Sequence, residues 1–196
     1  MRFYKFTNKE EVHNGFKYKT GLNVDTQPFN PSGDCKPGGL YFAREDIFAF
    51  VKYDGWLREV TLPENEPVYE NTREPKKFKA HRIILGEREK VTVEVIERLI
   101  KEGANAKVCG SCALRWAAYD GCIKIVKLLI PYSDVEAYNS QALRFAAKNG
   151  RIELVNLFIP LSDVKACDSE ALRWAKENKH TEIVKLLEEA LKGEKS

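Results

Sequence analysis

The sequence has 196 residues, of which 43% are hydrophobic and 31% charged, as expected of a globular protein with one or two domains. Its net charge of +3 comes from 32 basic and 29 acidic side chains, of which residues 1–90 hold 16 and 14. This small, evenly spread charge argues against a nucleic-acid partner. No apolar run approaches the roughly 20 residues that span a bilayer, so no membrane association is expected.

Features of the N-terminus and the cysteines indicate the compartment. The first residues, MRFYKFTNKEEVHNG, contain no continuous apolar core of the secretory type. The five cysteines are an odd number with uneven spacing, which argues against a disulfide framework. We therefore expect reduced thiols and a cytoplasmic location.

Residues 1–90 carry short β-rich runs separated by Gly, Pro, Asn and Asp, most clearly in DTQPFNPSGDCKPGG. One helix is expected over residues 44–54. This pattern predicts a small α+β domain. The expected strands are 2–8, 15–21, 38–44, 56–63, 66–72 and 77–87.

Residues 91–196 have an internal repeat. The stretch ALRWAA at 113–118 returns as ALRFAA at 142–147 and as ALRWAK at 171–176, each time after 29 residues. Self-similarity at a fixed period of this size indicates stacked supersecondary units. Each unit reads as two helices, and the second has one apolar stripe that a neighbouring unit must cover.

The ends of these helices are also marked in the sequence. We expect a serine before each first helix to cap it, a glycine to close it, and a proline to stop the second helix. Lys179 replaces the glycine in the last unit, so its first helix should be less well terminated. The residues concerned are Ser111, Ser140 and Ser169, then Gly121 and Gly150, then Pro131 and Pro160.

The run ALRWAAYDGCIKIVKLLI resembles the helical pair of an ankyrin repeat, and VIERLIKEGANA at 95–106 is similar to the second helix and Gly-Ala turn of that family. The resemblance covers roughly residues 91–192 and implies an all-α solenoid of about three and a half units. The period is 29 residues where the family has about 33, and the shortfall lies in the turns. Any partner site on ankyrin finger tips is therefore in doubt.

The N-terminal domain also carries a resemblance. Its runs HNGFKYKTGLN, PSGDCKPGGLYF and KFKAHRIILGE resemble the domain that precedes ankyrin-like repeats in proteins of large DNA viruses. The resemblance implies a viral origin and names no chemistry. Because REKVTV (88–93) leads directly into VIERLI, we expect the N-terminal domain to cap the α-helical stack.

Three columns of the repeat are candidates for a partner site. The ladder Trp116, Phe145 and Trp174 can form an aromatic strip for a partner or pack as framework between successive helices. A varying column follows the first helix, as a binding surface or a solvated face would. It consists of Tyr119 with Asp120, Lys148 with Asn149, and Glu177 with Asn178.

The third column contains Arg115, Arg144 and Arg173. It can bind an acidic partner. It can equally donate to neighbouring loop carbonyls and to the side chains of Asp134 and Asp163, which we favour.

A second reading assigns chemistry to residues 1–90. The stretch PGGLYFA and the upstream His13-Asn-Gly resemble ADP-ribosyltransferases, which would place His13 and Tyr41 at a nicotinamide dinucleotide with Glu59 or Glu87 as the acidic partner. The plainer reading is a turn at Gly38 and Gly39 followed by a core strand. A small nucleotide-binding domain with the repeats as a targeting arm is thus the alternative function.

Other chemistry finds little support in the sequence. Cys109 and Cys112 have the CxxC spacing of zinc sites, but their columns in the other repeats hold unrelated residues. There is no GxxxxGK[ST] phosphate loop and no GxGxxG. We therefore expect a non-catalytic protein with no cofactor or metal, which binds a protein, a host protein if it is viral, through the concave face of its repeats.

Overall fold

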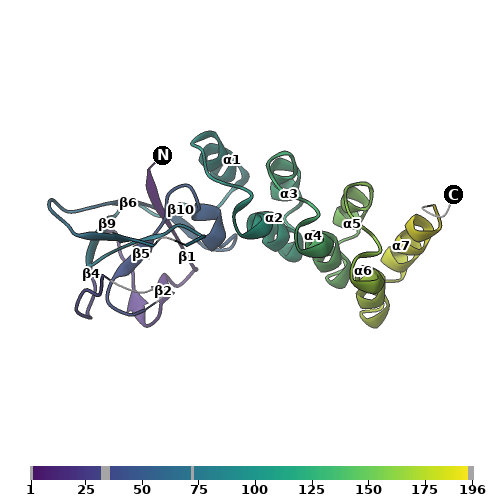
Figure 1. The fold of residues 1–196 in the computed structure, drawn as a ribbon, viewed down its shortest axis with the longest axis horizontal. Coiled ribbons are helices and arrows are strands. Elements are labelled where there is room, and N and C mark those ends of the chain that lie inside the picture. Colours follow the sequence, from purple (N-terminus) through teal and green to yellow (C-terminus); the bar gives the residue numbers. More distant parts are fainter. Residues whose placement is uncertain (1, 32–35, 72, 194–196) are drawn as a thin grey trace. The chain divides into compact units, whose positions relative to one another are not determined.

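The computed structural model describes residues 2–31, 36–71 and 73–193. The chain falls into two compact units, Met1–Cys109 and Gly110–Ser196 (Figure 1). The first is rich in strands and the second is helical. The domain boundary expected at residue 90 remains a prediction from the sequence, and residues 32–35 of the expected turn lie outside the described residues.

The largest sheet of the N-terminal unit has five antiparallel strands in the order β1-β6-β9-β4, with β10 also paired to β6. A second sheet has the order β5-β8-β7, and β2 pairs with β3 as a hairpin. The five-stranded sheet consists of β1 (Phe3–Thr7), β4 (Gly21–Val24), β6 (Trp56–Thr61), β9 (Arg82–Leu85) and β10 (Glu89–Lys90). The remaining strands are β2 (Val12–His13), β3 (Phe16–Lys17), β5 (Leu40–Phe42), β7 (Val68–Glu70) and β8 (Phe78–Ala80).

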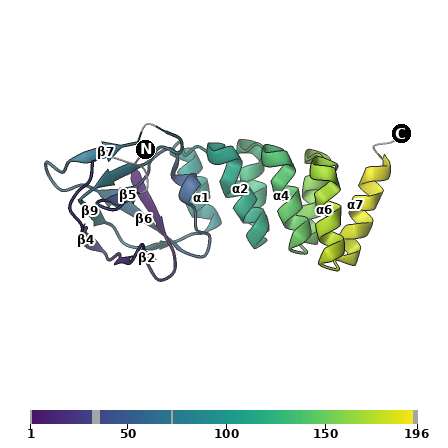
Figure 2. The same ribbon diagram turned by 60° about the horizontal axis from the view of Figure 1, so that its bottom comes forward.

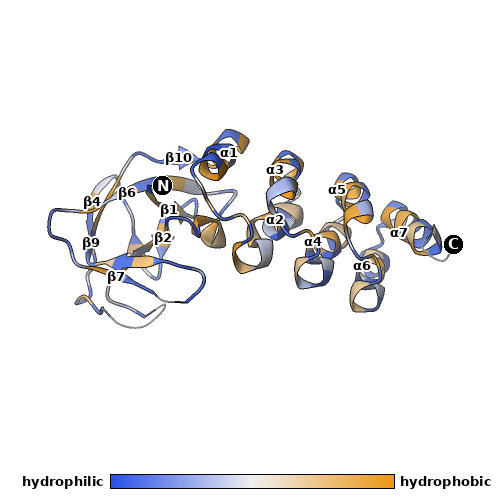
Figure 3. Cartoon of the chain, turned by 45° about the horizontal axis from the view of Figure 1, so that its top comes forward, coloured by the Kyte–Doolittle hydropathy of each residue, from blue (hydrophilic) through white to orange (hydrophobic). Residues whose placement is uncertain are grey.

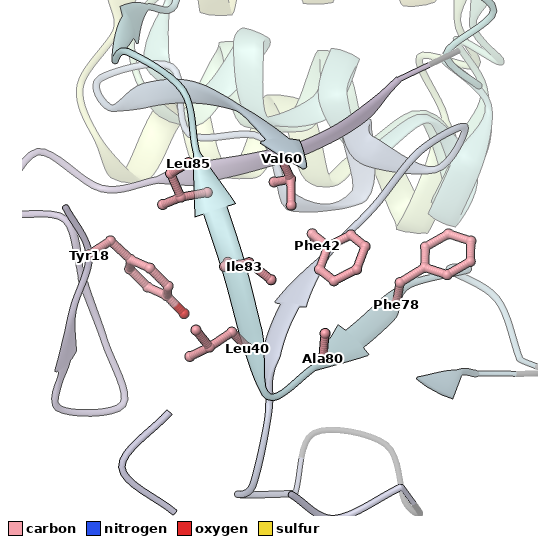
Figure 4. Packing of buried hydrophobic residues seen from close by; sticks show 8 residues of the cluster. All are labelled: Tyr18, Leu40, Phe42, Val60, Phe78, Ala80, Ile83 and Leu85. Atoms are coloured by element: carbon pink, nitrogen blue, oxygen red, sulfur yellow. The ribbon is translucent and has the colours of Figure 1, made fainter. Parts of the chain in front are cut away.

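Side chains from both sheets form the core of this unit (Figure 4). Leu40 and Phe42 come from β5, and Ile83 and Leu85 come from β9. The rings of Phe42 and Phe78 stack with their centroids 5.8 Å apart. This alternation of inward-facing apolar residues explains why β5 forms where the sequence reads GGLYFAR. The cluster contains Tyr18, Leu40, Phe42, Val60, Phe78, Ala80, Ile83 and Leu85.

Three expected elements differ from the structure. The strand expected over 15–21 is interrupted at residues 18–20, and its ends belong to the two separate strands β3 and β4. The strand expected over 77–87 is broken by a bend at His81, and its halves, β8 and β9, join different sheets. The helix expected over 44–54 is a short 3₁₀ helix, η1 (Ile47–Phe50). The Asp46 side chain does not cap it, because its carboxylate accepts from the backbone N–H of Lys76 at 2.7 Å and from Asn105 at 3.2 Å.

In the described part of the chain, the first repeat lacks its first helix, as the sequence indicates, and β10 leads directly into the second helix of that repeat. This helix, α1 (Val93–Lys101), is capped by Thr92, whose hydroxyl accepts from the N–H of Val95 at 3.4 Å. The turn after α1 is held by the N–H of Asn105, which donates to the carbonyl of Glu45 at 2.7 Å. The Asn105 bond ties the turn after α1 to the segment just before η1 in the same unit.

The helices of the second unit alternate as the repeat predicts. In Figure 1 the first helices of the repeats, α2, α4 and α6, form one row, and the second helices, α3 and α5, form another. Helix α4 packs against α5 and α6, and α7 packs against both α5 and α6 (Figure 2). Their bounds are α2 (Val108–Asp120), α3 (Ile123–Leu129), α4 (Ala137–Lys148), α5 (Ile152–Phe158), α6 (Ala166–Glu177) and α7 (Thr181–Gly193).

Colouring by hydropathy shows apolar and polar faces on the same helices (Figure 3). The repeated alanines and leucines of ALRWAA and ALRFAA are the buried ones: Ala113, Leu114, Ala142 and Leu143 are each 0% exposed. The second helices end before their prolines, which lie in the 3₁₀ turns η2 (Ile130–Tyr132) and η3 (Ile159–Leu161). The stop signals predicted from the prolines are therefore confirmed.

The glycine turns are confirmed as well. Gly121 and Gly150 close the first helices with φ of 78° and 68°. Lys179 has the same left-handed conformation, with φ of 59°, so the last turn keeps its shape with a side chain that disfavours it. Of the polar tail, residues 194–196 lie outside the described residues.

The role expected for the serines is wrong. Each serine ends a three-residue left-handed turn, at 109–111, 138–140 and 167–169, with φ between 51° and 60°. The Ser111 hydroxyl accepts from the N–H of Asp134 at 2.7 Å, and that of Ser140 accepts from Asp163 at 2.9 Å. These serines therefore bind the turn of the next repeat rather than their own helix.

Candidate functional site

An aromatic cluster lies on the first helices of two neighbouring repeats. The rings of Trp116 and Phe145 stack with centroids 6.1 Å apart, and Tyr119 contacts both edge-on at 5.9 Å and 5.5 Å. Trp116 is 48% exposed and Tyr119 is 42% exposed. These three rings thus pack two neighbouring helices together and also present an aromatic surface to solvent.

The third ring of the ladder has a different environment. Trp174 is partly buried on α6, and its ring lies beneath two cations of α4: the Lys148 ammonium at 4.8 Å and the Arg144 guanidinium at 5.8 Å. A cation over an indole face is a favourable contact. Along the ladder, the contact between α2 and α4 is therefore made by stacked aromatic rings, and the contact between α4 and α6 is made by cations over a ring.

The varying column is largely exposed at the ends of these helices. Asp120, Lys148, Glu177 and Asn178 are exposed, and Asn149 is half-buried. The amide of Asn149 donates to the carbonyl of Phe145 at 2.9 Å, and that of Asn178 donates to the carbonyl of Trp174 at 2.8 Å. Both asparagines thus close their own helices.

The arginine column holds the left-handed turns. Arg144 donates to the carbonyls of Tyr138 at 2.7 Å and Asn139 at 3.0 Å, and it also contacts the carboxylate of Glu170. Arg115 donates to the carbonyl of Gly110 at 2.9 Å and to Gln141. These bonds confirm the prediction that the arginines donate to neighbouring loop carbonyls.

The aspartates of the next turn have other partners. Asp134 and Asp163 accept from the N–H groups of Glu136 and Lys165 in their own turns, at 3.1 Å and 2.8 Å. The side chains of the next repeat that accept from the arginines are instead Gln141, which is the partner of Arg115, and Glu170, which is the partner of Arg144. No periodic pairing rule in the sequence pointed to them, because they lie 26 residues further along the chain.

Tyr138 is an exposed residue of the repeats whose role the sequence did not indicate. Its ring covers the Arg115 guanidinium at 4.3 Å, and it is 59% exposed. A Cβ built at Gly110 would lie 2.3 Å from this ring, so the left-handed glycine is needed there. Tyr138 lies in the column that holds Cys109 and Cys167 in the other repeats. Because the residue type changes along this column, the repeat pattern did not indicate a role for Tyr138.

The N-terminal unit contains one feature of the alternative reading. His13 and Tyr41 line a common cavity of about 830 Å³. Glu59 and Glu87 line a second hollow, of about 280 Å³, together with Arg98 and Glu102. The acidic partner that a transferase site requires is thus absent from the described lining of the first cavity, and the expected constellation does not form.

Two further observations concern metals and membranes. Over the described ranges, no group of three or more His, Cys, Asp or Glu side chains gathers as metal ligands would. Cys109 is half-buried and Cys112 is buried, and neither forms a disulfide with another described cysteine. None of the helices between residues 2 and 193 that the structure describes is long and apolar enough to cross a bilayer.

Comparison with known proteins identifies the helical part. A family model for ankyrin repeats matches residues 88–168 in three copies. A mimivirus relative (Acanthamoeba polyphaga mimivirus) named "Uncharacterized protein R869" is 33% identical over 133 residues, which is 65% of this chain and 96% of that protein. The chain belongs to the ankyrin repeat family.

Other relatives from the same virus carry the family in their names. "Putative ankyrin repeat protein R868" is 36% identical over 134 residues, and "Putative ankyrin repeat protein R229" is 35% identical over 129 residues. These alignments cover 65% and 62% of this ankyrin repeat chain, but 66% and 42% of the relatives. The alignments therefore span only part of the length of these relatives.

The viral relatives also resemble the strand-rich region. An alignment over 65% of this chain is longer than the segment from residue 88 to the last residue, so it includes part of residues 1–87. The resemblance to ankyrin proteins of large DNA viruses is thus confirmed. The comparisons give no support to the transferase or nucleotide-binding reading.

Proposed function

We propose that this ankyrin repeat protein binds another protein through its repeats, as a non-catalytic interaction module. The observation that carries the proposal is the exposed aromatic cluster of Trp116, Tyr119 and Phe145. Aromatic side chains of this kind supply most of the energy at protein interfaces. A single exposed Trp is common on protein surfaces, but three rings in mutual contact form a larger apolar patch.

The proposed surface continues from the cluster along the helix ends. Its polar part contains acceptors at Asp120 and Glu177 and a donor at Lys148, whose ammonium also lies over the Trp174 ring. This arrangement, an apolar centre with a polar rim, is typical of interfaces between proteins that also exist apart. The full surface consists of Trp116, Tyr119, Asp120, Phe145, Lys148, Asn149, Trp174, Glu177 and Asn178.

The wider setting is also a proposal. We infer that the repeats form a solenoid capped by the strand-rich domain and present this surface on their concave side. Because the relatives are mimivirus proteins, the partner we propose is a protein of the infected host, met in the cytoplasm. Enzymatic activity is not part of the proposal.

Photo-crosslinking tests this proposal directly. A photoreactive phenylalanine analogue replaces Tyr119 in one sample and Tyr132 in another, and host-cell extract is irradiated with each. Tyr132 is a matched control, because it is 49% exposed and lies in the turn η2 rather than on the proposed surface. We expect one stoichiometric adduct from position 119 and none from position 132. Equal adducts from both, or none from 119, would contradict the proposal.

A further inference from the structure

The cavity beside His13 and Tyr41 has a basic lining that the proposed protein binding does not use. Its ionisable basic side chains are Lys5, His13, Lys52 and Lys77, and the described residues that line it include no Asp or Glu. Burial and the charges of Lys5 and Lys52 lower the pKa of His13, and all three side chains line this cavity. The lining also includes six aromatic side chains: Tyr4, Phe6, Tyr18, Tyr41, Phe42 and Phe50.

Lys5 is the most unusual of these residues. It lies in the middle of β1 and is 7% exposed. Its ammonium donates to the carbonyl of Tyr41 at 2.7 Å and lies 4.3 Å from the centre of the Tyr18 ring. Burial lowers the pKa of Lys5 to about 7. A buried cation whose partners, within the described residues, are a carbonyl and a ring but no carboxylate is destabilising, and groups in such environments cluster at functional sites.

The neighbouring carboxylate is already engaged. Arg58, opposite Lys5 on β6, is fully buried and lies 3.0 Å from Glu11. Glu11 also accepts from the Thr7 hydroxyl at 3.4 Å. Glu11 is therefore neutralised by Arg58, and no carboxylate among the described lining residues offsets the charge of the lysines.

We propose that this cavity binds a small organic anion that carries an aromatic ring. Lys5, Lys52 and His13 surround the anionic group, and the tyrosine and phenylalanine walls contact the ring. The volume of about 830 Å³ lies in the range of sites that hold small organic molecules and far exceeds that of an inorganic ion. The proposal concerns the strand-rich unit alone and does not depend on the protein-binding surface of the repeats.

The charge on Lys5 gives the site a defined pH dependence. With a pKa of about 7, the Lys5 side chain of the protein without ligand is half protonated at pH 7 and almost fully deprotonated at pH 9. Anion affinity should therefore fall roughly tenfold to fiftyfold between these values. Burial and the Asp25 charge raise the pKa of Tyr18, and burial together with Glu102 raises that of Tyr4, so both rings stay neutral at pH 9. The other charges that face Lys5 are those of His13, Lys52 and Lys77 in the lining and of the Arg58–Glu11 pair.

Titration of the full chain with phenyl phosphate, followed by calorimetry and by amide chemical shifts, tests the proposal. This probe carries the same charge at pH 7 and pH 9, because the second pKa of a phosphate ester is about 6. We expect binding at least tenfold tighter than that of inorganic phosphate or phenol, with shifts confined to the cavity lining. Equal affinity for inorganic phosphate, or no binding at millimolar concentration, would overturn the proposal.

Substitution of Lys5 separates the site from general attraction to a basic protein. Lys5→Met should weaken phenyl phosphate binding at least tenfold at pH 7 and remove the difference between pH 7 and pH 9. The control is Lys9→Met, because Lys9 is exposed and lies 3.6 Å from Asp54; its affinity should match the wild type. Unchanged binding by Lys5→Met would overturn the proposal. If that variant does not fold, the pH ratio of the wild type decides, and an equal affinity at both values counts against it.

Discussion

The hydroxyl of Ser140 accepts a hydrogen bond from the backbone N–H of Asp163, 23 residues further along the chain, at 2.9 Å. Ser140 is fully buried, and Ser111 makes the same bond to Asp134 at 2.7 Å. The donor in each case is the turn that begins the next repeat. Adjacent repeats are therefore joined by a polar bond as well as by the packing of alanine and leucine side chains.

This bond predicts a specific effect of removing the hydroxyl. Ser140→Ala removes the acceptor of the partly buried bond from the Asp163 N–H, so the free energy of unfolding should fall by about 0.5–1.5 kcal/mol. Ser169→Ala is the matched control, because Ser169 is half-buried at the same place in the last repeat; the loss there should stay below about 0.5 kcal/mol. Urea unfolding followed by circular dichroism measures both values. A smaller loss for Ser140 than for Ser169 would show that the bond does not join the repeats.

The arginine column predicts a second contrast. The Arg144 side chain is 11% exposed and donates to two carbonyls of its left-handed turn. Arg173 is 57% exposed, donates to the carbonyl of Cys167 at 3.4 Å and lies 3.8 Å from the carboxylate of Glu170. Arg144→Met should lower the free energy of unfolding by about 2–3 kcal/mol, because it removes two partly buried hydrogen bonds to carbonyls and the ion pair with Glu170. Arg173→Met should cost less than about 1 kcal/mol. Equal costs in thermal unfolding would refute this assignment.

The turn after α6 can be improved. Lys179 has a φ of 59° where Gly121 and Gly150 stand in the earlier repeats. Lys179→Gly relieves the left-handed strain of a residue with a Cβ and should raise the free energy of unfolding by about 1 kcal/mol. The control is Gly150→Lys, which should destabilise the protein, because a Cβ there would lie 2.8 Å from the His180 ring. A lower melting temperature for Lys179→Gly would contradict the strain argument.

Lys5 predicts how stability varies with pH. Its pKa of about 7 in the folded chain is lower than the ordinary value of 10.5, so the unfolded chain binds more protons between these values. Stability of the wild type, relative to Lys5→Met, should therefore rise with pH from about 7 to 10, with a slope of up to about 1.4 kcal/mol per unit. At pH 7 the Met variant should be the more stable of the two. Parallel stability curves from urea unfolding at pH 7, 8, 9 and 10 would mean that Lys5 has no shifted pKa.

The helical part could be predicted from the sequence because its signals are local. The glycine turns, the proline stops and the apolar spacing all depend on residues within one or two turns of helix. The serine bond could not be predicted, because its donor lies in another repeat. In the strand-rich unit, β8 and β9 read as one continuous run, and only their pairing with different partners separates them at His81.

The basic cavity was missed for a related reason. In β1 the sequence FYKFT suggests that Lys5 faces solvent, but residues 4–7 of this strand are all buried, so both of its faces are covered. Lysine in a doubly covered strand is visible only once the second layer is known. His13 and Tyr41 were singled out from a resemblance, and the lysines around them complete a different kind of site.

The affinity of the crosslinked partner for two alanine variants tests the central claim most directly. Trp116 and Tyr132 are almost equally exposed aromatic residues of the helical unit, at 48% and 49%, and only Trp116 belongs to the cluster with Tyr119 and Phe145. If the repeats bind protein through this cluster, Trp116→Ala should weaken the complex at least tenfold and Tyr132→Ala less than twofold. A complex equally tight in wild type and Trp116→Ala would contradict the account.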